Sequence, residues 1–433
     1  MDIYFANESI MVLRMRQSIY ILLFFCIHGC VKVFAQTDTT TITLNQCIAA
    51  ALGYNPNLKE AGNEVGVSEI AIKTNGSGLY PVVSSEANAG ISNEYRLGNN
   101  YRTGNANINA DQLLWQNGKV RLSVVQAKYL HQASRYNFEA RKGDLIVSVK
   151  ITFFNCLLQD QLYRVAVDNV SKATLFLDYA RERYTIGLAR KSDVLKAESD
   201  LAQSEFDRDS FLNSHKQARN ELSMLTGFSN DRLSGLADEG EMIPYNQPDS
   251  ILSLAFTMYP EMQSIKNINL SQVAKINEET AGFFPQLGIR AGYDWAYNPL
   301  IQQQHGWYSL VTFRWTIFNG NDRHYRVQTE QVRKKIYENQ ADEIRNYLIK
   351  EIRNRIIGIK DAENRITLSK RLMKTTSENL EIAKAQYKSG TGSMLELTDA
   401  RINDLNAKQQ NIQAMTAYQI GLANLERLLG NND

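Results

Sequence analysis

Apolar residues recur at alternating three- and four-residue steps from Ile146 to Leu177 and from Ile402 to Leu425, a spacing that is typical of coiled-coil seams. Two long stretches have a helical pattern: the first begins after Gly118 and continues to about Thr185, and the second begins after Gly320 and continues to Lys388. Neither contains proline, the residue that most often interrupts a helix. At about 1.5 Å per residue, each stretch predicts a helix about 100 Å long. In the first half of the chain, two shorter helices are predicted near residues 44–75 and 192–226.

Strict alternation of apolar and polar residues marks four other segments as strands with two unlike faces. They come in two pairs, one before each long helix. The predicted apolar faces carry Val83, Ser85, Ala87, Ala89, Ile91 and Tyr95; Ala106, Ile108, Ala110 and Leu114; Leu287, Ile289, Ala291, Tyr293, Trp295 and Tyr297; and Val311, Phe313, Trp315 and Ile317. Each strand has about ten or more residues, enough for a tilted strand to cross a bilayer. A soluble sheet with one wet face is the alternative interpretation.

The order of these elements repeats along the chain, and so do short landmarks. The stretches "RYTIGLARKSDVLKAES" and "QYKSGTGSMLELTDAR" both place Tyr, two residues and Gly before a polar patch and an acidic residue. Their glycines, Gly187 and Gly390, are 203 residues apart, and other landmarks keep this register. We therefore predict a tandem duplication, with one structural repeat over residues 36–240 and a second over residues 241–433. Each repeat contains a short helix, two strands, a long helix and a return helix.

The two repeated turns have a geometric explanation. Each long helix runs away from its strands, so the chain must reverse before the next helix can return. Gly187 and Gly390 suit a helix C-terminus, where a left-handed residue is common. Ser192 and Asp193 suit the N-cap of the following helix in the first repeat, and Ser393 suits it in the second. Two hairpins are therefore expected to reach one distant tip.

The first 35 residues have the features of a secretory signal peptide. Arg14 and Arg16 precede an apolar run at residues 18–27 that is too short to span a bilayer, and a small-residue cleavage site follows at residues 33–35. A lipoprotein processing site at Cys30 is the alternative interpretation. Cleavage after residue 35 predicts an exported protein.

Composition excludes several classes of function. A net charge of +2 over 433 residues gives no sign of nucleic-acid binding, which requires a basic excess. No pair of histidines has metal-ligand spacing, and the sequence has no phosphate loop or nucleophile elbow. We expect no catalytic, cofactor-binding or metal-binding residues, and no enzyme. Cys47 and Cys156 remain after signal cleavage, and we expect two buried free thiols, with a disulfide as the alternative.

Four membrane strands cannot close on themselves, because eight is the smallest usual number and an open edge is not tolerated in lipid. If the strands are transmembrane, several chains must pool them. A dimer supplies eight strands and a filled lumen, whereas a trimer supplies twelve and room for a pore. These considerations predict an oligomer without choosing between the two. The alternative to an oligomeric membrane pore is a periplasmic coiled-coil scaffold without a pore.

From "LNQCIAAALGYNPNL" to "ANLERLLG", the chain resembles the TolC-like outer-membrane efflux protein family, also called outer membrane factors. The resemblance is carried by the duplication, "FFPQLG" before a strand, "QNGK" and "FNGN" before the long helices, and both Tyr-x-x-Gly turns. It implies a mostly α-helical fold with membrane β-strands: long antiparallel coiled-coil hairpins and four transmembrane strands per chain. The implied assembly is a homotrimer with a 12-stranded barrel and an α-helical tunnel. The implied equatorial region is about residues 228–250 together with the chain ends.

The resemblance also implies a function and a location. The protein would be the outer-membrane exit duct of a tripartite efflux or type I secretion system, in a Gram-negative-type cell. It would passively conduct substrates from the adaptor and the pump to the exterior, with its strands in contact with outer-membrane lipid and its helices extending into the periplasm. Its partners would be a periplasmic adaptor (membrane fusion) protein and an inner-membrane pump of the RND or ABC type.

In that family the tip turns form the closed entrance, which makes them the candidate gate here. By position, Asp193 in the first turn would face Tyr387 in the second, and Glu396 and Asp399 would supply acidic rings at the narrowest point. The alternative interpretation is that these acids only stabilise helix N-termini through the helix dipole.

The second turn departs from the family pattern at one position. The family often has an arginine two residues after the second-turn glycine, whereas this chain has Gly392. Arg190 and Lys191, in the first turn, are the candidate replacements.

Overall fold

The computed structural model describes residues 41–93, 100–236, 249–297 and 304–430. The described residues from Ile42 onward belong to one compact unit. The predicted signal peptide with Cys30, most of the predicted equatorial segment, and Tyr95 lie outside the described residues.

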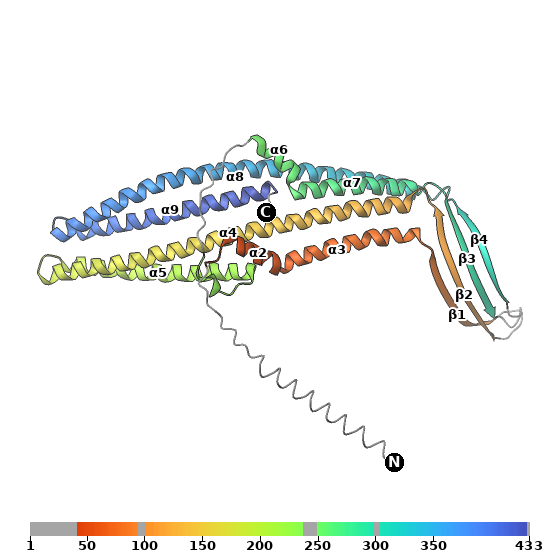
Figure 1. Cartoon of the computed structure of the whole chain (residues 1–433), viewed down its shortest axis with the longest axis horizontal. Helices are drawn as coiled ribbons and strands as arrows, with labels where there is room; N and C mark the ends of the chain where they lie inside the picture. The colour runs from red at the N-terminus through yellow and green to blue at the C-terminus, as the bar shows by residue number, and fades with distance from the viewer. Residues whose placement is uncertain (1–40, 94–99, 237–248, 298–303, 431–433) are drawn as a thin grey trace, which may run out of the picture. The chain divides into compact units, whose positions relative to one another are not determined.

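The described elements follow one order twice (Figure 1). The first series is α2 (Leu44–Tyr54), α3 (Pro56–Gly76), η1 (Ser77–Leu79), β1 (Val82–Asn93), β2 (Asn100–Trp115), α4 (Lys119–Thr185) and α5 (Lys191–Thr226). After η2 (Arg232–Ser234), the second series is α6 (Asp249–Met258), α7 (Pro260–Ala281), β3 (Gln286–Tyr297), β4 (Gln304–Arg314), α8 (Asp322–Ser389) and α9 (Met394–Leu428). The predicted fold class, long helical hairpins plus four strands, is confirmed. The repeat boundaries at residues 36–240 and 241–433 stay a prediction.

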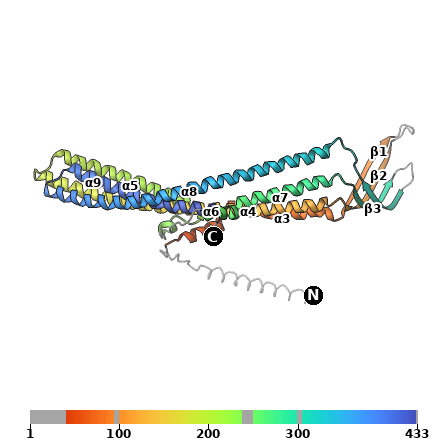
Figure 2. The same cartoon turned by 90° about the horizontal axis from the view of Figure 1, so that it is seen from above.

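The helices form a slab in which α4 is central. α4 packs against α3 and α5 on one side and against α7 and α9 on the other, and α7 and α9 pack in turn against α8 (Figures 1 and 2). The two edges of the slab are therefore α8 and the line formed by α3 and α5. Over the residues that the structure describes, no α-helix is both long and apolar enough to be a transmembrane helix.

Three apolar clusters hold the helices together. One joins α2, α4 and α5 around Phe153 and Leu222. A second joins α6, α8 and α9 around Ile352 and Tyr418. The third joins the ends of α4 and α8 to the starts of α5 and α9, and includes Tyr387. Both hairpins thus have an apolar core and are packed together at their turns.

The four strands form one antiparallel sheet in the order β1-β2-β3-β4. Cross-strand partners share a face, so the register joins the predicted apolar positions into one continuous surface. One row, for example, reads Ala87, Ala106 and Trp295, and it ends at the polar His305 of β4. The opposite face carries Glu86, Asn88, Asn105, Asn107, Asn109, Asp111, Arg290, Asp294 and Thr312. In the described part of the chain, no helix packs across either face.

The alternation fails at one predicted position. Leu114 lies at a register shift between Leu113, which pairs with Gly288, and Trp115, which pairs with Leu287. A β-bulge adds one residue and turns the following side chains over. The apolar position predicted for Leu114 is therefore taken by Trp115.

Cys47 and Cys156 are both fully buried and unpaired, so the prediction of free thiols is confirmed. Cys47 on α2 and Cys156 on α4 nevertheless belong to the same apolar cluster. Burial raises the pKa of each thiol to about 11, which keeps both in the unreactive protonated form.

Candidate functional site

The two predicted turns lie together at the end of the helices that is farthest from the sheet (Figures 1 and 2). The first connects α4 to α5 and the second connects α8 to α9. Gly187 has φ 78° and Gly390 has φ 84°, the left-handed conformation that ends a helix. The turn amides close back on the helices: Leu188 N–H donates to the carbonyl of Arg183 (2.8 Å), and Gly392 N–H donates to that of Gln386 (3.0 Å).

Two of the three predicted acids at the helix starts bond to the backbone, and the third is exposed. The carboxylate of Asp193 accepts a hydrogen bond from the backbone N–H of Arg190 (3.1 Å), and that of Glu396 accepts one from the N–H of Ser393 (2.8 Å). Ser393 in turn caps α9 through the N–H of Glu396 (3.2 Å). Asp399 is exposed, one turn farther along α9. Asp193 and Glu396 thus stabilise helix starts. Glu396 is also exposed, so its negative charge can attract cations from the solution.

One capping prediction is wrong. The N-cap residue of α5 is Arg190, and Asp193 lies three residues into the motif rather than at the cap with Ser192. The N-cap lies two residues before Ser192 because the Asp193 carboxylate reaches back to the Arg190 N–H, the second half of a capping box. The Ser393 cap of α9 is as predicted.

Tyr387 is buried between the hairpins, with 3% of its surface exposed. Burial raises the pKa of its phenol, and the nearby Asp193 carboxylate raises it further. The Asp193 carboxylate is therefore close enough to influence the phenol, and the gate role expected for the pair stays a prediction. Among the described residues, however, the Tyr387 hydroxyl has no hydrogen-bond partner, so the two side chains are neighbours without a bond.

Arg183 reaches from the first hairpin to the second, a contact that sequence reasoning missed. Its guanidinium donates to the backbone carbonyl of Tyr387 (2.5 Å) and to that of Leu188 (3.3 Å), and it lies 5.1 Å from the centroid of the Tyr387 ring. Arg190 and Lys191, the expected replacements, are exposed at the start of α5. In sequence, Arg183 is an ordinary cation in the last turn of a helix, so no local signal distinguishes it.

The departure at Gly392 has a steric cause. A Cβ at this position would lie 3.0 Å from Cβ of Gln386 and 3.3 Å from the backbone N of Tyr387. Any side chain here would require the end of α8 to shift by a few tenths of an ångström, so the close return of the turn onto α8 disfavours the arginine that the family often places here.

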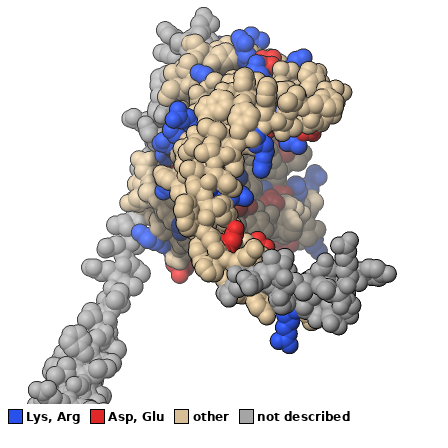
Figure 3. All heavy atoms as spheres, turned by 90° about the vertical axis from the view of Figure 1, so that its right-hand side faces the viewer, with Lys and Arg blue, Asp and Glu red and all other residues tan. Residues whose placement is uncertain are grey.

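The sheet is the second functional surface. Seen from that end of the molecule, the surface has broad areas without charged residues (Figure 3). On its polar face, Arg290 donates to Asp111 (2.5 Å) and the Tyr308 hydroxyl donates to Asn109 (2.6 Å). A Cβ at Gly292 would lie 2.8 Å from the Tyr308 hydroxyl, so glycine leaves room for this network. Within the described ranges, no group of three or more acidic, His or Cys side chains could hold a metal ion.

The profile of the family "Outer membrane efflux protein" matches residues 47–228 and 263–431, which is most of the chain. The chain belongs to the outer membrane efflux protein family. Membership identifies it as an outer-membrane protein with a periplasmic helical extension, as expected from the sequence.

Individual outer membrane efflux proteins are distant in sequence and close in fold. Outer membrane protein TolC of Escherichia coli K12 is 21% identical over 401 residues, covering 87% of this chain and 80% of TolC. The solved outer membrane protein VceC of Vibrio cholerae superposes with a TM-score of 0.78 at 16% identity, covering 89% of this chain and 96% of VceC. The CmeC outer membrane channel of Campylobacter jejuni gives 0.77 at 18% identity, covering 90% of this chain and 86% of CmeC.

Proposed function

We propose that the protein is the outer-membrane exit duct of a tripartite efflux or type I secretion system. Three copies form a 12-stranded barrel in the outer membrane, continued by a helical tunnel in the periplasm. Substrates pass passively through it from an inner-membrane pump of the RND or ABC type, joined by a periplasmic adaptor. The observation that carries the proposal is a sheet with two uncovered, chemically opposite faces and two open edges.

The sheet suits neither water nor lipid as a single copy. Its apolar face would expose a wide patch to water, and its edge strands, β1 and β4, leave a row of unpaired backbone groups. Lipid accepts the apolar face but not the open edges. Pooling strands so that β4 of one copy pairs with β1 of the next removes both edges. The apolar face then contacts lipid, and the polar face lines a lumen.

The edges of the helical slab are the continuation of the sheet edges. β1 follows α3 through η1, and β4 leads into α8. A rotation about an axis along the helices that joins β4 to β1 of the next copy therefore also brings α8 against its α3 and α5. One head-to-tail contact, repeated around the axis, closes a ring from sheet to tip.

Exposed apolar side chains on α8 indicate that this helix packs against a second copy of the chain. At 100° per residue, the large exposed apolar residues of α8 fall within an arc of about 100°. This outer stripe consists of Tyr325, Val332, Ile336, Tyr347, Ile357, Leu368, Leu372 and Ile382. Its length, about 85 Å, requires a partner surface that is equally long.

The line of α3 and α5 carries exposed apolar residues at the same heights as residues of the outer stripe, where height means position along the helix axis. A rotation about an axis along the helices leaves heights unchanged, so positions within one chain predict contacts between copies. Hydrogen bonds from Thr398 to Asp200 and from Ser369 to Asn411 relate the heights of α5, α9 and α8. The contacts of α3 with α4, of α4 with α7 and of α7 with α8 relate those of α3 and α8.

Counting residues from these hydrogen bonds gives the relative heights of the exposed apolar side chains. Met224 of α5, which is 71% exposed, lies within about 2 Å of the height of Ile357, which is 66% exposed. Ile70 of α3 lies within about 3 Å of the height of Ile336. The match at two levels, about 30 Å apart, favours α8 packing on α3 and α5 of a second copy.

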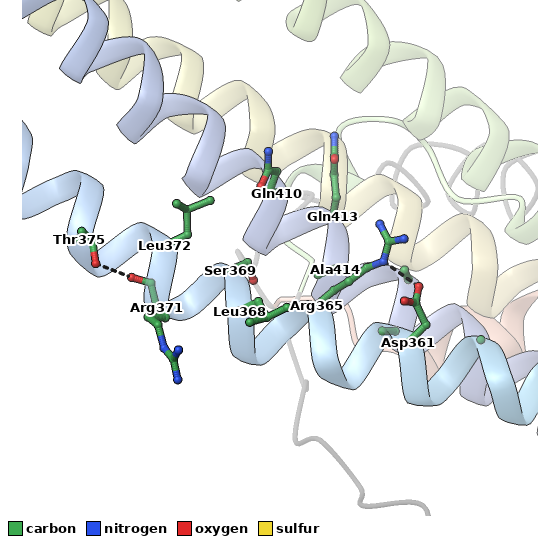
Figure 4. A pocket seen from close by; sticks show the side chains of 13 residues that line it. Asp361, Arg365, Leu368, Ser369, Arg371, Leu372, Thr375, Gln410, Gln413 and Ala414 are labelled. Carbon is green, nitrogen blue, oxygen red and sulfur yellow. Dashed lines mark hydrogen bonds and ion pairs between the residues drawn. The ribbon is translucent and has the colours of Figure 1, made fainter. Parts of the chain in front are cut away.

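A groove between α8 and α9 adds shape to this surface (Figure 4). It has a volume of about 950 Å³ and is lined by Leu368 and Leu372 of the outer stripe, with Gln410 and Gln413 of α9 on its other side. Arg365 is held at its end by Asp361 (2.7 Å). By height, the groove lies opposite the half of α5 that ends near Met224, so a neighbouring α5 would fill it.

The number of copies follows from the need for a pore. Two copies would supply eight strands, whose interior is filled by side chains, whereas three supply twelve. Three copies also bring three tips around one axis. Glu396 and Asp399 would then form acidic rings at the entrance, and the pair of Asp193 and Tyr387 would help to close it.

Reconstitution tests the function. Purified protein in a planar bilayer should form a stable channel that prefers cations and is blocked by multivalent ones, because the acidic rings attract them. A protein that is recovered from the water-soluble fraction and never conducts would instead support the scaffold interpretation.

Cysteine cross-linking tests the interface between copies. The pair Met224→Cys with Ile357→Cys should give disulfide-linked oligomers up to the trimer on non-reducing gels. The control pair, Met224→Cys with Val332→Cys, places a thiol about 35–40 Å away along the same stripe and should give none. Equal cross-linking by both pairs, or by neither, would contradict the proposed packing. The thiols of Cys47 and Cys156 are buried and do not take part.

A further inference from the structure

A buried polar layer crosses the contact between the two hairpins, a few turns above the tip. Arg401 of α9 donates to the side-chain oxygens of Asn169 on α4 (2.6 Å) and Ser204 on α5 (3.2 Å). Asn169 also donates to Ser204 (3.0 Å). None of the three side chains is more than 5% exposed. We call Arg401, Asn169 and Ser204 the Arg401 layer.

We propose that the Arg401 layer is a second lock of the entrance, and that Arg401 is a positioning residue which fixes the second hairpin against the first in the closed state. The proposal rests on the proposed function, because a lock requires a channel that opens. It is separate from the contact of Arg183 with Tyr387, which lies at the turns themselves.

The surroundings explain why a polar layer can act as a lock. Below it, the hairpins meet through apolar side chains such as Phe176, Leu177 and Leu397. Apolar seams specify helix register less strictly than a buried polar residue does, because a buried guanidinium is tolerated only where its partners are in place. The layer therefore permits one register. Arg401 is about 10 Å from the start of α9, close enough for a change of register to move the turn.

A cleft beside the layer supplies alternative partners. It lies between α5 and α9, has a volume of about 400 Å³, and is lined by Arg401, Asp200, Asp207 and Phe211. Burial lowers the pKa of Arg401, while the carboxylates of Asp200 and Asp207 raise it. In the observed state, Asp200 accepts a hydrogen bond from Thr398 (2.9 Å). If α9 shifts along α5, the guanidinium can leave its two neutral partners for these carboxylates, so the layer has two discrete sets of partners.

Three variants test the lock by single-channel recording of assemblies whose trimeric state is checked on native gels. Arg401→Met leaves the buried side-chain oxygen of Asn169 without its donor, so the high-conductance state should become about tenfold more populated. Arg401→Lys keeps the charge but cannot make both bonds, and should give an intermediate result. Arg401→Met combined with Asn169→Leu and Ser204→Ala makes the whole layer apolar, so the channel should be as closed as the wild type or more so.

The test depends on the difference in high-conductance population between the single and the triple variant. Asn403→Met, at an exposed position two residues along α9, is the matched control and should behave as the wild type. Wild-type gating in both Arg401→Met and Arg401→Lys would overturn the lock. So would equal leakiness in the single and triple variants, because the layer would then act only through packing. A wild-type protein that never conducts would instead overturn the proposed function.

Discussion

Two neighbouring residues of β2 offer a matched test of which side of the sheet contacts lipid. Ala106 lies on the apolar face, opposite Trp295 of β3, and Asn107 lies on the polar face between Glu86 and Asp294. Both are partly buried and differ by one residue in depth. Ala106→Arg and Asn107→Arg therefore introduce the same charge at the same level on opposite faces.

The expected difference is large. An arginine facing lipid near the bilayer midplane costs about 2–4 kcal/mol. At about 1.4 kcal/mol per factor of ten, that is a 30- to 700-fold effect for each chain. In a trimer the cost is incurred three times, about 6–12 kcal/mol in total, which is comparable to the whole stability of a domain. For Asn107→Arg, cross-strand attraction to Glu86 and Asp294 instead contributes about 0.2–1 kcal/mol of stabilisation per pair.

The assay is the amount of folded trimer in the outer-membrane fraction, quantified by its heat-dependent mobility on SDS gels. Ala106→Arg should reduce it to less than about a tenth of the wild-type amount, and Asn107→Arg should leave it within about a factor of two. If both variants accumulate equally, or if Ala106→Arg folds in the water-soluble fraction, the apolar face is not in lipid and the reasoning is refuted.

Three further predictions concern the tip. Replacing both Glu396 and Asp399 with Ala should weaken cation selectivity while leaving the trimer intact, because both lie far from the strands; unchanged selectivity would show that they serve only the start of α9. Arg183→Ala should raise conductance, since it removes charged hydrogen bonds worth about 1–3 kcal/mol, discounted here for partial exposure; Arg181→Ala, an exposed control paired with Glu198 (2.8 Å), should not. Gly392→Ala should lower the thermal unfolding midpoint, because the added Cβ meets the end of α8 at 3.0 Å; an unchanged midpoint would mean that the turn adapts freely.

The strands and long helices could be read from the sequence because their signals are local. Alternation with period two assigned Ala106, Trp295 and most of the apolar face correctly, and the register then joined positions that each strand had marked independently. Trp315 and Ile317 lie beyond the end of β4 at Arg314. The bulge at Leu114 could not be read in this way. Leu114 and Trp115 are both apolar, so the pattern gives no sign of which one faces lipid.

The polar contacts between the hairpins could not be predicted from the sequence, for a different reason. Arg183 and Arg401 look like ordinary helical cations, and a helical arginine is normally exposed. Their partners, the Tyr387 carbonyl and Asn169, are respectively 204 and 232 residues away. Only the docking of one hairpin on the other brings them within reach, and no local pattern encodes that docking. Gly392, by contrast, was singled out in sequence as a departure, and the structure supplies its steric cause.

The copy number of the membrane-extracted protein tests the central claim most directly. Native mass measurement in detergent should give one species with three times the mass of the mature chain, because only pooled strands remove the open edges of β1 and β4 and leave room for a pore. A stable monomer in the water-soluble fraction would contradict the account.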